Sequence, residues 1–407
     1  MKTRFLTTQV LLFLFAASWL NVPGMLYERF SFNKFLAYHG HDLFPFFIPV
    51  LLVFIVFTAE MSRLSKEKTF IKFSVQDLSF LILCILILLL EVLHSGSIGT
   101  KFSFNLFLPI FTFYGFYFLY SRYSYLVRST DPTRRLLHYS VYLLVFLLCI
   151  HLLGYLGFVP HFRAYGGSSS LAIELLTNLT RVDVLQANTS SYYAVFLIFI
   201  ILFFRKLLNF RAFTLTLFFS LALLMLFWNQ SRGAMVTLVL VLFIKLLETE
   251  RITTFYKTLI LLFSFTLLTS LAVIFANSRL FNFADSSGLE RVTLIYNAVA
   301  QIMEYPFLGL GADFEQNFRF GFASKVVVHS WILRFMIGYG IVGFVLILFT
   351  YLKMFNQRIN FSLIASLGLV LGIMIFETYL FWWLSLLPVL SHYAYRVKVL
   401  NQPIKAT

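Results

Sequence analysis

The sequence predicts an all-α polytopic membrane protein with about 12 transmembrane helices and a long helical periplasmic loop. Of its 407 residues, 60% are hydrophobic and 12% are charged, whereas a soluble domain carries about 25% charged residues. The apolar residues fall in blocks of roughly 17–24 residues, the length that a helix needs to cross a hydrocarbon core of about 30 Å. Because lipid offers no hydrogen-bond partners, each block must pair its own backbone groups, and helices are therefore expected.

The apolar blocks divide one integral membrane domain, residues 1–407, into 12 predicted spans. These spans are residues 5–21, 43–59, 78–95, 102–120, 137–158, 190–204, 212–229, 233–247, 256–276, 329–351, 360–377 and 380–395. The first block resembles a signal peptide, because Lys2 and Arg4 precede it, but about 17 apolar residues is long for such a segment. We expect it to be kept as a span, and its cleavage stays open.

Basic residues give the spans an orientation. When the loops are assigned alternately to two sides, the side with both termini carries 21 of the 32 Lys and Arg residues but only six of the 17 Asp and Glu residues. The other side carries 11 of each and is neutral. Because cytoplasmic loops are enriched in Lys and Arg, both termini are predicted to be cytoplasmic. The net charge of +15 is thus an orientation signal and requires no nucleic-acid partner.

The periplasmic side carries two long connecting segments, residues 159–189 and 277–328. Long structured loops commonly carry function. The residues in these segments lack the spacing of a metal site, and the chain has no nucleotide-binding or hydrolase motif, so neither a metal nor another cofactor is expected. The two cysteines, Cys84 and Cys149, lie within apolar blocks and are interpreted as small hydrophobic residues.

A helix is predicted in the segment 277–328. Ser287 followed by Glu290 fits a capping box, which marks a helix start. The apolar residues that follow at three- and four-residue spacing are Leu289, Val292, Tyr296, Val299 and Met303. The helix is therefore amphipathic and is expected to lie on the helix bundle or on the membrane surface. Arg291 falls near its start, where free backbone N–H groups favour an anion.

Arg232 lies in a short turn between two spans, in the segment Asn229-Gln230-Ser231-Arg232-Gly233. So short a turn holds the guanidinium near the bilayer surface. An arginine there can simply extend its head group to water, but arginine also binds phosphate through two parallel hydrogen bonds, and charges at membrane depth are functional candidates. We therefore nominate Arg232 as a functional residue.

Three further candidates belong to the last predicted spans. His329 begins the span 329–351, where a neutral imidazole could accept a proton from a hydroxyl group. An interfacial anchor beside Trp331 is the alternative. Arg334 lies deeper in the same span and could form an ion pair with Glu377, which would give both residues a supporting, structural role.

The segment 159–189 contains another amphipathic pattern. The apolar residues at helical spacing are Leu171, Leu175, Leu179 and Val182. A helix over about 169–182 is therefore expected to lie in the membrane interface. Arg181 stands near the end of this pattern and precedes Asn188, which leads into the span 190–204.

Several segments together resemble the O-antigen ligase/polymerase family, most closely over about residues 180–350. They are the stretch from Arg181 to Asn188, Asn229-Gln230-Ser231-Arg232-Gly233, Gly288-Leu289-Glu290-Arg291, Tyr305-Pro306-Phe307-Leu308-Gly309-Leu310-Gly311, His329-Ser330 and Gly338-Tyr339-Gly340-Ile341-Val342-Gly343. Their order, spacing and outer-face placement carry the resemblance. The first half of the chain is similar in topology only.

The resemblance implies a metal-independent, inverting glycosyltransferase with a mostly helical fold. Its donor would be a glycan on undecaprenyl pyrophosphate, and its acceptor would be lipid A–core for a ligase or a carrier-linked glycan for a polymerase. Family members use arginines on the pyrophosphate and a histidine on the acceptor. This assigns Arg232, Arg291 and, less closely, Arg181 to the pyrophosphate, and His329 to the acceptor hydroxyl. Several ligases have two nearby histidines where this chain has His329-Ser330, so ligase and polymerase both stay open.

A transporter or flippase of lipid-linked sugars is the main alternative, because many spans and buried arginines suit it as well. Transporters commonly show repeated halves and broken helices near the midplane, whereas the halves of this sequence differ and its polar residues gather at the outer face. A polymer-export partner without chemistry of its own is the other alternative. The sequence leaves the sugar, its linkage and the oligomeric state open.

Overall fold

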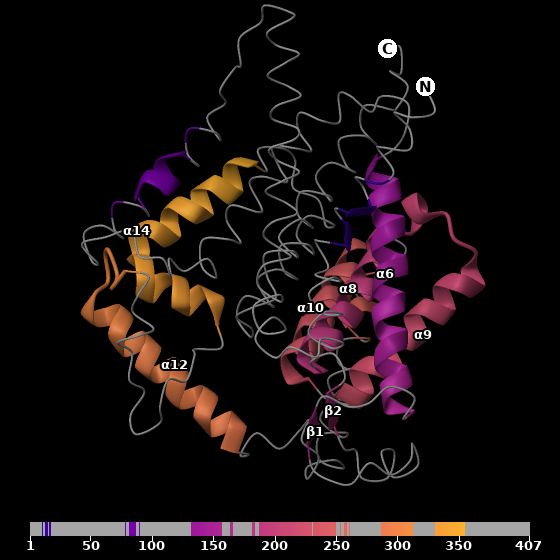
Figure 1. Ribbon diagram of the computed structural model, residues 1–407. Helices are drawn as coiled ribbons and strands as arrows, with labels where there is room; N and C mark the ends of the chain where they lie inside the picture. The colour runs from indigo at the N-terminus through magenta and orange to yellow at the C-terminus, as the bar shows by residue number, and fades with distance from the viewer. Residues whose placement is uncertain are drawn as a thin grey trace, which may run out of the picture. The chain divides into compact units, whose positions relative to one another are not determined.

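The computed structural model describes residues 132–156, 163–165, 181–183, 187–229, 231–249, 286–311 and 330–354, together with isolated residues within 10–17, 78–89 and 253–260. They belong to two compact units, whose helices and strands are labelled in Figure 1. The first unit contains helix α6 (Pro132–Tyr155), strands β1 (Arg163–Tyr165) and β2 (Arg181–Asp183), and helices α8 (Ala187–Leu208), α9 (Ala212–Asn229) and α10 (Arg232–Glu248). The second contains α12 (Ser286–Glu304) and α14 (Trp331–Met354).

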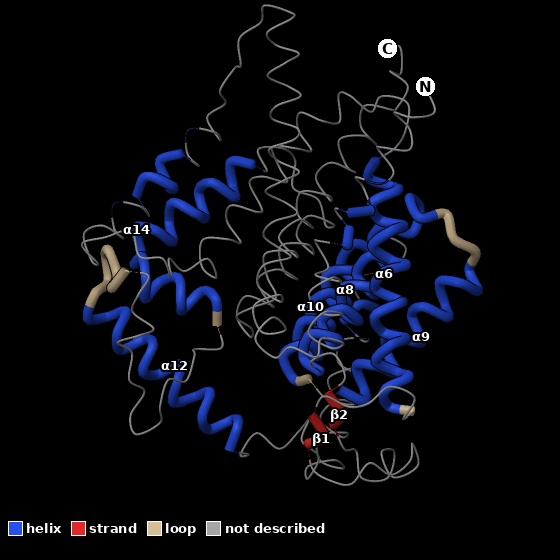
Figure 2. Tube along the Cα trace, viewed as in Figure 1, coloured by secondary structure: helices blue, strands red, loops and turns tan. Residues whose placement is uncertain are grey.

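Helices make up most of the residues that the structure describes in each unit (Figure 2), as the lengths of the apolar blocks predicted. The helices α6, α8, α9, α10 and α14 match the predicted spans 137–158, 190–204, 212–229, 233–247 and 329–351 to within five residues at each end. Three of the described helices are long and apolar enough to cross a membrane: Arg134–Gly154, Ser190–Leu208 and Ala212–Asn229. The other predicted spans lie wholly or largely outside the described residues, so the count of 12 stays a prediction.

The helix α8 forms the centre of the first unit. Its residues from Tyr192 to Ile200 are apolar on every side and fully buried. A helix of this kind is expected to be surrounded by other helices, and α8 contacts α6, α9 and α10. Since lipid is as apolar as these side chains, close packing favours the arrangement. The stacked rings of Phe199 and Phe203, with centroids 5.1 Å apart, contribute about 1 kcal/mol to it.

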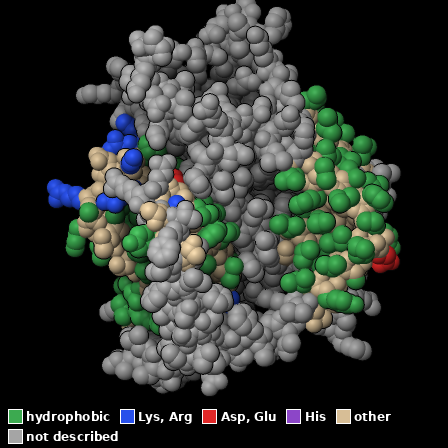
Figure 3. All heavy atoms as spheres, turned by 180° about the vertical axis from the view of Figure 1, so that it is seen from behind, with side chains coloured by type: hydrophobic (Ala, Val, Ile, Leu, Met, Phe, Trp, Pro, Cys, Tyr) green, Lys and Arg blue, Asp and Glu red, His purple; other side chains and the backbone are tan. Residues whose placement is uncertain are grey.

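The connection between α8 and α9 is a tight turn with a basic end. Arg205 and Lys206 occupy the last turn of α8, where cations interact favourably with the helix dipole. Asn209 then adopts a left-handed conformation, with φ of 51°, which is typical of a helix end. The Nε2 of His138 on α6 donates to the carbonyl of Leu208 at 2.7 Å. Figure 3 shows Lys and Arg side chains gathered at one edge of the face in view, where most of the other described side chains are hydrophobic.

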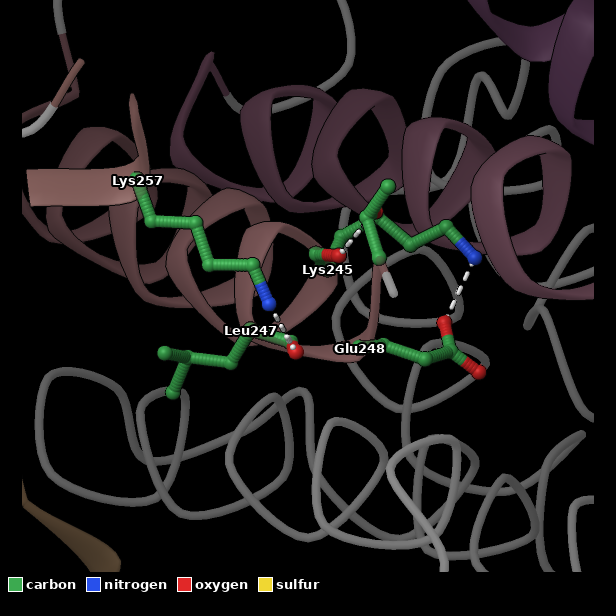
Figure 4. Close-up of polar contacts among 5 residues, drawn as sticks. Lys245, Leu247, Glu248 and Lys257 are labelled. Atoms are coloured by element: carbon green, nitrogen blue, oxygen red, sulfur yellow. Dashed lines mark hydrogen bonds and ion pairs between the residues drawn. The ribbon is translucent and has the colours of Figure 1, made fainter. Parts of the chain in front are cut away.

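Polar contacts also close the C-terminal end of α10 (Figure 4). The Nζ of Lys245 forms an ion pair with Glu248 at 2.5 Å and lies 4.8 Å from the centre of the Phe203 ring. The Nζ of Lys257 donates to the carbonyl of Leu247 at 2.9 Å, one of the last carbonyls, which have no partner within the helix. These contacts give both lysines a structural role.

A short antiparallel ladder lies between α6 and α8 in the chain. It pairs β1 with β2 and sets Ala164 opposite Val182. The helix expected over 169–182 was therefore wrong at its C-terminal end, because Arg181 and Val182 belong to β2. Val182 is β-branched, and the sequence Arg181-Val182-Asp183 alternates polar and apolar residues, which favours a strand. The rest of that expected helix lies outside the described residues.

In the second unit, α12 is amphipathic as predicted and begins at Ser286, one residue before the expected cap. Its buried side chains include Leu294 and Ala298, whereas Tyr296 and Met303 of the predicted apolar stripe are about three-quarters exposed, at 74% and 75%. An apolar stripe that the protein leaves uncovered is typical of a helix in a membrane interface.

The helix α14 is interrupted at Gly340, whose φ of 61° and ψ of −168° are not helical. In a continuous helix, the N–H groups of Ile341 and Val342 would donate to the carbonyls of Ile337 and Gly338. The interruption breaks these two bonds and frees four backbone groups. Such groups must find other partners within a membrane.

The turn that follows α12 supplies all four partners. Its hydrogen bonds run from Ile341 N–H to the Pro306 carbonyl (2.8 Å), from Val342 N–H to the Phe307 carbonyl (3.2 Å), from Leu310 N–H to the Ile337 carbonyl (2.8 Å) and from Gly311 N–H to the Gly338 carbonyl (2.8 Å). We call this insertion of residues 306–311 into the break at 337–342 the clasp. A Cβ on Gly340 would overlap the Phe307 carbonyl, and a Cβ on Gly309 would lie 2.5 Å from the Ile337 carbonyl oxygen.

Candidate functional site

Arg232 is the first residue of α10, and only Gln230 and Ser231 separate it from the end of α9. Ser231 is buried and extended, with φ of −83° and ψ of 106°. Its carbonyl accepts the first hydrogen bond of α10, from Met235 N–H at 3.0 Å. Gly233 is buried as well, while Arg232 is half-exposed. The predicted short turn is confirmed, and it holds Arg232 at the packed start of a helix.

The start of α10 combines two sources of positive charge, a helix N-terminus and an arginine. A helix N-terminus carries a partial positive charge, which acidic side chains or bound anions stabilise. The first turn of α10 contains no acidic residue and begins with Arg232. The first turn of α12 also lacks acidic residues, and Glu290 and Arg291 follow it. An anion bound at the start of α10 would gain roughly 0.3–1 kcal/mol from the helix dipole.

Ser330 caps the start of α14. Its carbonyl accepts the N–H of Arg334 at 3.0 Å, and its Oγ accepts the N–H of Leu333 at 3.4 Å, which is the pattern of a helix N-cap. The prediction that His329 begins this helix was therefore wrong by two residues, since the cap follows it in the chain. His329 itself lies outside the described residues.

Arg334 lies one turn into α14 and is only 1% exposed. Burial of a charged side chain is costly, and such a residue in a membrane protein normally faces partners within the protein. The supporting role of Arg334 stays a prediction. Glu377, its expected partner, lies outside the described residues, so the ion pair stays a prediction.

The remaining candidate, Arg181, is the first residue of β2, a strand that contacts both α8 and α9. Arg181 and Arg232 belong to the first unit, and Arg291 and Arg334 belong to the second. The convergence of these arginines on one pyrophosphate therefore stays a prediction. Among the residues that the structure describes, there is no group of three His, Cys, Asp or Glu side chains that could hold a metal ion.

The sequence patterns missed a buried polar cluster beside the Arg232 turn. It consists of His151 on α6, Ser190 on α8 and Asn229 on α9, each at most 1% exposed. The Nε2 of His151 lies 2.9 Å from Asn229 Oδ1, and Asn229 Nδ2 lies 3.2 Å from Ser190 Oγ. We call these residues the His–Ser–Asn cluster. The only signal in the sequence was a polar residue near one end of each of three apolar spans.

The fold and these residues define a helical membrane protein whose polar groups gather at helix ends. The family model described as O-antigen ligase matches residues 217–348. This match confirms, over that segment, the resemblance to the O-antigen ligase/polymerase family seen in the sequence. The matched segment includes Arg232, Arg291, His329 and Arg334 and leaves out Arg181 and Glu377. No curated protein and no solved structure matches the chain.

Proposed function

We propose that the protein is a glycosyltransferase of the bacterial inner membrane that transfers or polymerises, on the periplasmic face, a glycan carried by undecaprenyl pyrophosphate. One observation carries the proposal. The segment that matches the O-antigen ligase family contains Arg232 and Arg291, near the starts of two helices that lack acidic residues in their first turns, and also contains His329. A pyrophosphate needs positive charge of this kind, and an acceptor hydroxyl needs a base.

Arginine suits the pyrophosphate better than lysine does. Its planar guanidinium donates two parallel hydrogen bonds to phosphate oxygens and stays charged at every relevant pH. Arg232 and Arg291 would hold the donor, and Arg181 would assist them. Arg334, buried in α14, would support the site with Glu377.

The proposed reaction is an inverting displacement. The acceptor hydroxyl oxygen attacks the anomeric carbon from the face opposite the pyrophosphate, so a new C–O bond forms while the C–O bond to the pyrophosphate breaks. The hydroxyl proton passes to the neutral imidazole of His329. Undecaprenyl pyrophosphate leaves with the negative charge that the arginines stabilise. Since pyrophosphate is already a good leaving group, the step requires no metal.

Two acceptors fit this chemistry, lipid A–core in a ligase and a carrier-linked glycan in a polymerase. The banding of lipopolysaccharide from a deletion strain distinguishes them. Loss of polymerase leaves core carrying a single repeat unit, whereas loss of ligase leaves core without any.

The proposed orientation places the start of α12 in the periplasm and the connection between α8 and α9 in the cytoplasm. The basic residues support it, because Arg205 and Lys206 end α8 and cytoplasmic ends are enriched in such residues. Both Lys206 and Glu304, at the end of α12, are exposed. In intact cells, a membrane-impermeant thiol reagent should label Glu304→Cys but not Lys206→Cys, with Cys84 and Cys149 replaced by Ala. The reverse pattern would place the proposed site on the wrong side.

A flippase of lipid-linked sugars would draw support from the broken helix α14, because transporters use such breaks to bind substrates. Here the four backbone groups freed around Gly340 are bonded to the turn 306–311, so they do not face a substrate. Transfer of glycan by the purified protein in detergent, where no membrane separates two compartments, distinguishes an enzyme from a flippase.

We expect Arg232→Lys to reduce glycan transfer about 10- to 100-fold, the effect of losing one charge-assisted hydrogen bond. Lysine keeps the charge but cannot bond two phosphate oxygens at once. The measurement is transfer from undecaprenyl-pyrophosphate-linked glycan by purified protein in excess chelator. Arg205→Lys, at the opposite end of the first unit, is the matched control and should transfer normally. Normal transfer by Arg232→Lys would contradict the assignment, and activity restored only by magnesium would contradict the metal-independent step.

A further inference from the structure

We infer that the His–Ser–Asn cluster positions Arg232 for the donor pyrophosphate. The inference rests on the proposed function of Arg232 and extends it to His151, Ser190 and Asn229, which come from three different helices. Asn229 is the last residue of α9, and the chain reaches Arg232 after only two more residues. Whatever fixes Asn229 therefore fixes the origin of the turn that carries Arg232.

The hydrogen bonds of the cluster have a defined direction. The Oδ1 of Asn229 can only accept, so the Nε2 of His151 donates to it at 2.9 Å. The Nδ2 of Asn229 then donates to Ser190 Oγ at 3.2 Å. Both ends of the Asn229 amide are thus held, one by α6 and one by α8. The contact between Ser190 Oγ and His151 Nε2, at 3.5 Å, is too long to add much.

The turn is also held at its other end. Ser231 is 5% exposed, and its carbonyl bonds to Met235 N–H at 3.0 Å. The Oγ1 of Thr237, fully buried, donates to the carbonyl of Gly233 at 2.8 Å. Since the anchored residues Asn229, Ser231 and Gly233 stand on both sides of the turn, they restrict the place at which α10 presents Arg232.

Stability alone does not explain a polar cluster at this place. Burying polar groups costs free energy that their hydrogen bonds mainly offset, and apolar residues of similar shape often stabilise a fold equally well. Hydrogen bonds add direction, because their distances and angles are narrow. A binding site gains from such precision, since a displacement of about 1 Å can cost up to about 10²-fold in rate.

The test compares binding of undecaprenyl pyrophosphate with thermal unfolding, both measured on the full-length protein in detergent. His151→Leu leaves the Asn229 amide partly unpaired and should lower both stability and affinity. The triple variant His151→Leu, Ser190→Ala, Asn229→Leu removes the whole cluster. It should regain most of the stability that His151→Leu loses. It should still bind the lipid about tenfold more weakly than the unchanged protein, which corresponds to about 1.4 kcal/mol of binding free energy. His151→Gln, which keeps a donor near the Nε2 position, should bind within about twofold of it.

Three further variants separate the possible outcomes. Ser140→Ala removes a buried hydroxyl of α6 that bonds only within its own helix, to the Leu136 carbonyl at 2.7 Å, and should bind normally. Ser190→Ala is the mildest change to the cluster and should weaken binding of undecaprenyl pyrophosphate about threefold. If the triple variant does not fold, this variant tests the positioning role in its place. Normal binding by the triple variant, or by Ser190→Ala in its place, overturns the positioning role alone. Normal binding by Arg232→Ala overturns the proposed function itself.

Discussion

Replacing His329 with Ala is expected to lower glycan transfer by about 10²–10⁴-fold, the usual contribution of a positioned general base. Binding of undecaprenyl pyrophosphate should stay near normal, because the histidine is proposed to act on the acceptor. The place of His329 in the chain supports this role. In the sequence it immediately precedes Ser330, the N-cap of α14. The measurement is single-turnover transfer and carrier-lipid binding on the same purified variant.

His138→Ala is a matched control for this prediction. His138 donates to the Leu208 carbonyl at the end of α6 opposite to His151. Its loss should reduce stability but not the transfer rate of the folded protein. Transfer by His329→Ala at the rate of the unchanged protein would make His329 an interfacial anchor. A loss of donor binding in the same variant would assign His329 to the pyrophosphate instead.

The helices of the first unit were predictable because each has its cause within its own segment. The helix α9 has the bounds of its predicted span, residues 212–229, since both ends coincide with a change from apolar to polar or charged residues. The same reasoning missed the strand β2. A ladder of three residues depends on a partner, here Arg163–Tyr165, that stands well before it in the chain. Local spacing alone therefore favoured a helix there.

The candidate site was predictable only for residues whose role can be inferred from the sequence immediately around them. An arginine in a short turn of an apolar chain is conspicuous, and the structure places Arg232 at a helix start as expected. His151 was not conspicuous, because its partner Asn229 lies 78 residues away. Only the packing of α6, α8 and α9 brings the two together. For the same reason, one sequence can nominate Arg291 and His329 but cannot bring them to Arg232.

The glycines of the second unit show the same limit. Gly338 and Gly340 were noted within the family resemblance, but their spacing gave no sign that α14 is broken. Glycine is frequent in transmembrane helices, so a continuous helix was the natural expectation. The break is explained by the turn after α12, which forms hydrogen bonds with the four backbone groups that the break leaves without helical partners. The clasp thus joins the helix of Arg291 to the helix that follows His329.

Replacing Gly340 with Ala is expected to open the clasp. The backbone of Gly340, with φ of 61° and ψ of −168°, lies in a region that is essentially restricted to glycine, and the added Cβ would overlap the Phe307 carbonyl. The helix can relieve this strain by becoming continuous, which restores two helical bonds but leaves the turn 306–311 without four. The variant therefore either keeps the clasp at a strain of about 1–3 kcal/mol or opens it with a net loss of two hydrogen bonds, about 0.5–1.5 kcal/mol each, so its free energy of unfolding should fall by about 1–3 kcal/mol.

Thermal unfolding in detergent and glycan transfer check this expectation together. Gly309→Ala should give the same defect from the other side of the clasp, because its φ is 70° and its Cβ would lie 2.5 Å from the Ile337 carbonyl oxygen. Val345→Ala changes an exposed side chain of the same helix and should shift stability by no more than about 0.5 kcal/mol. Equal defects in the two glycine variants would identify the clasp as the cause, because Gly309 and Gly340 lie in different segments that the clasp joins. If Gly340→Ala unfolds and transfers like the unchanged protein, the turn 306–311 does not hold α14.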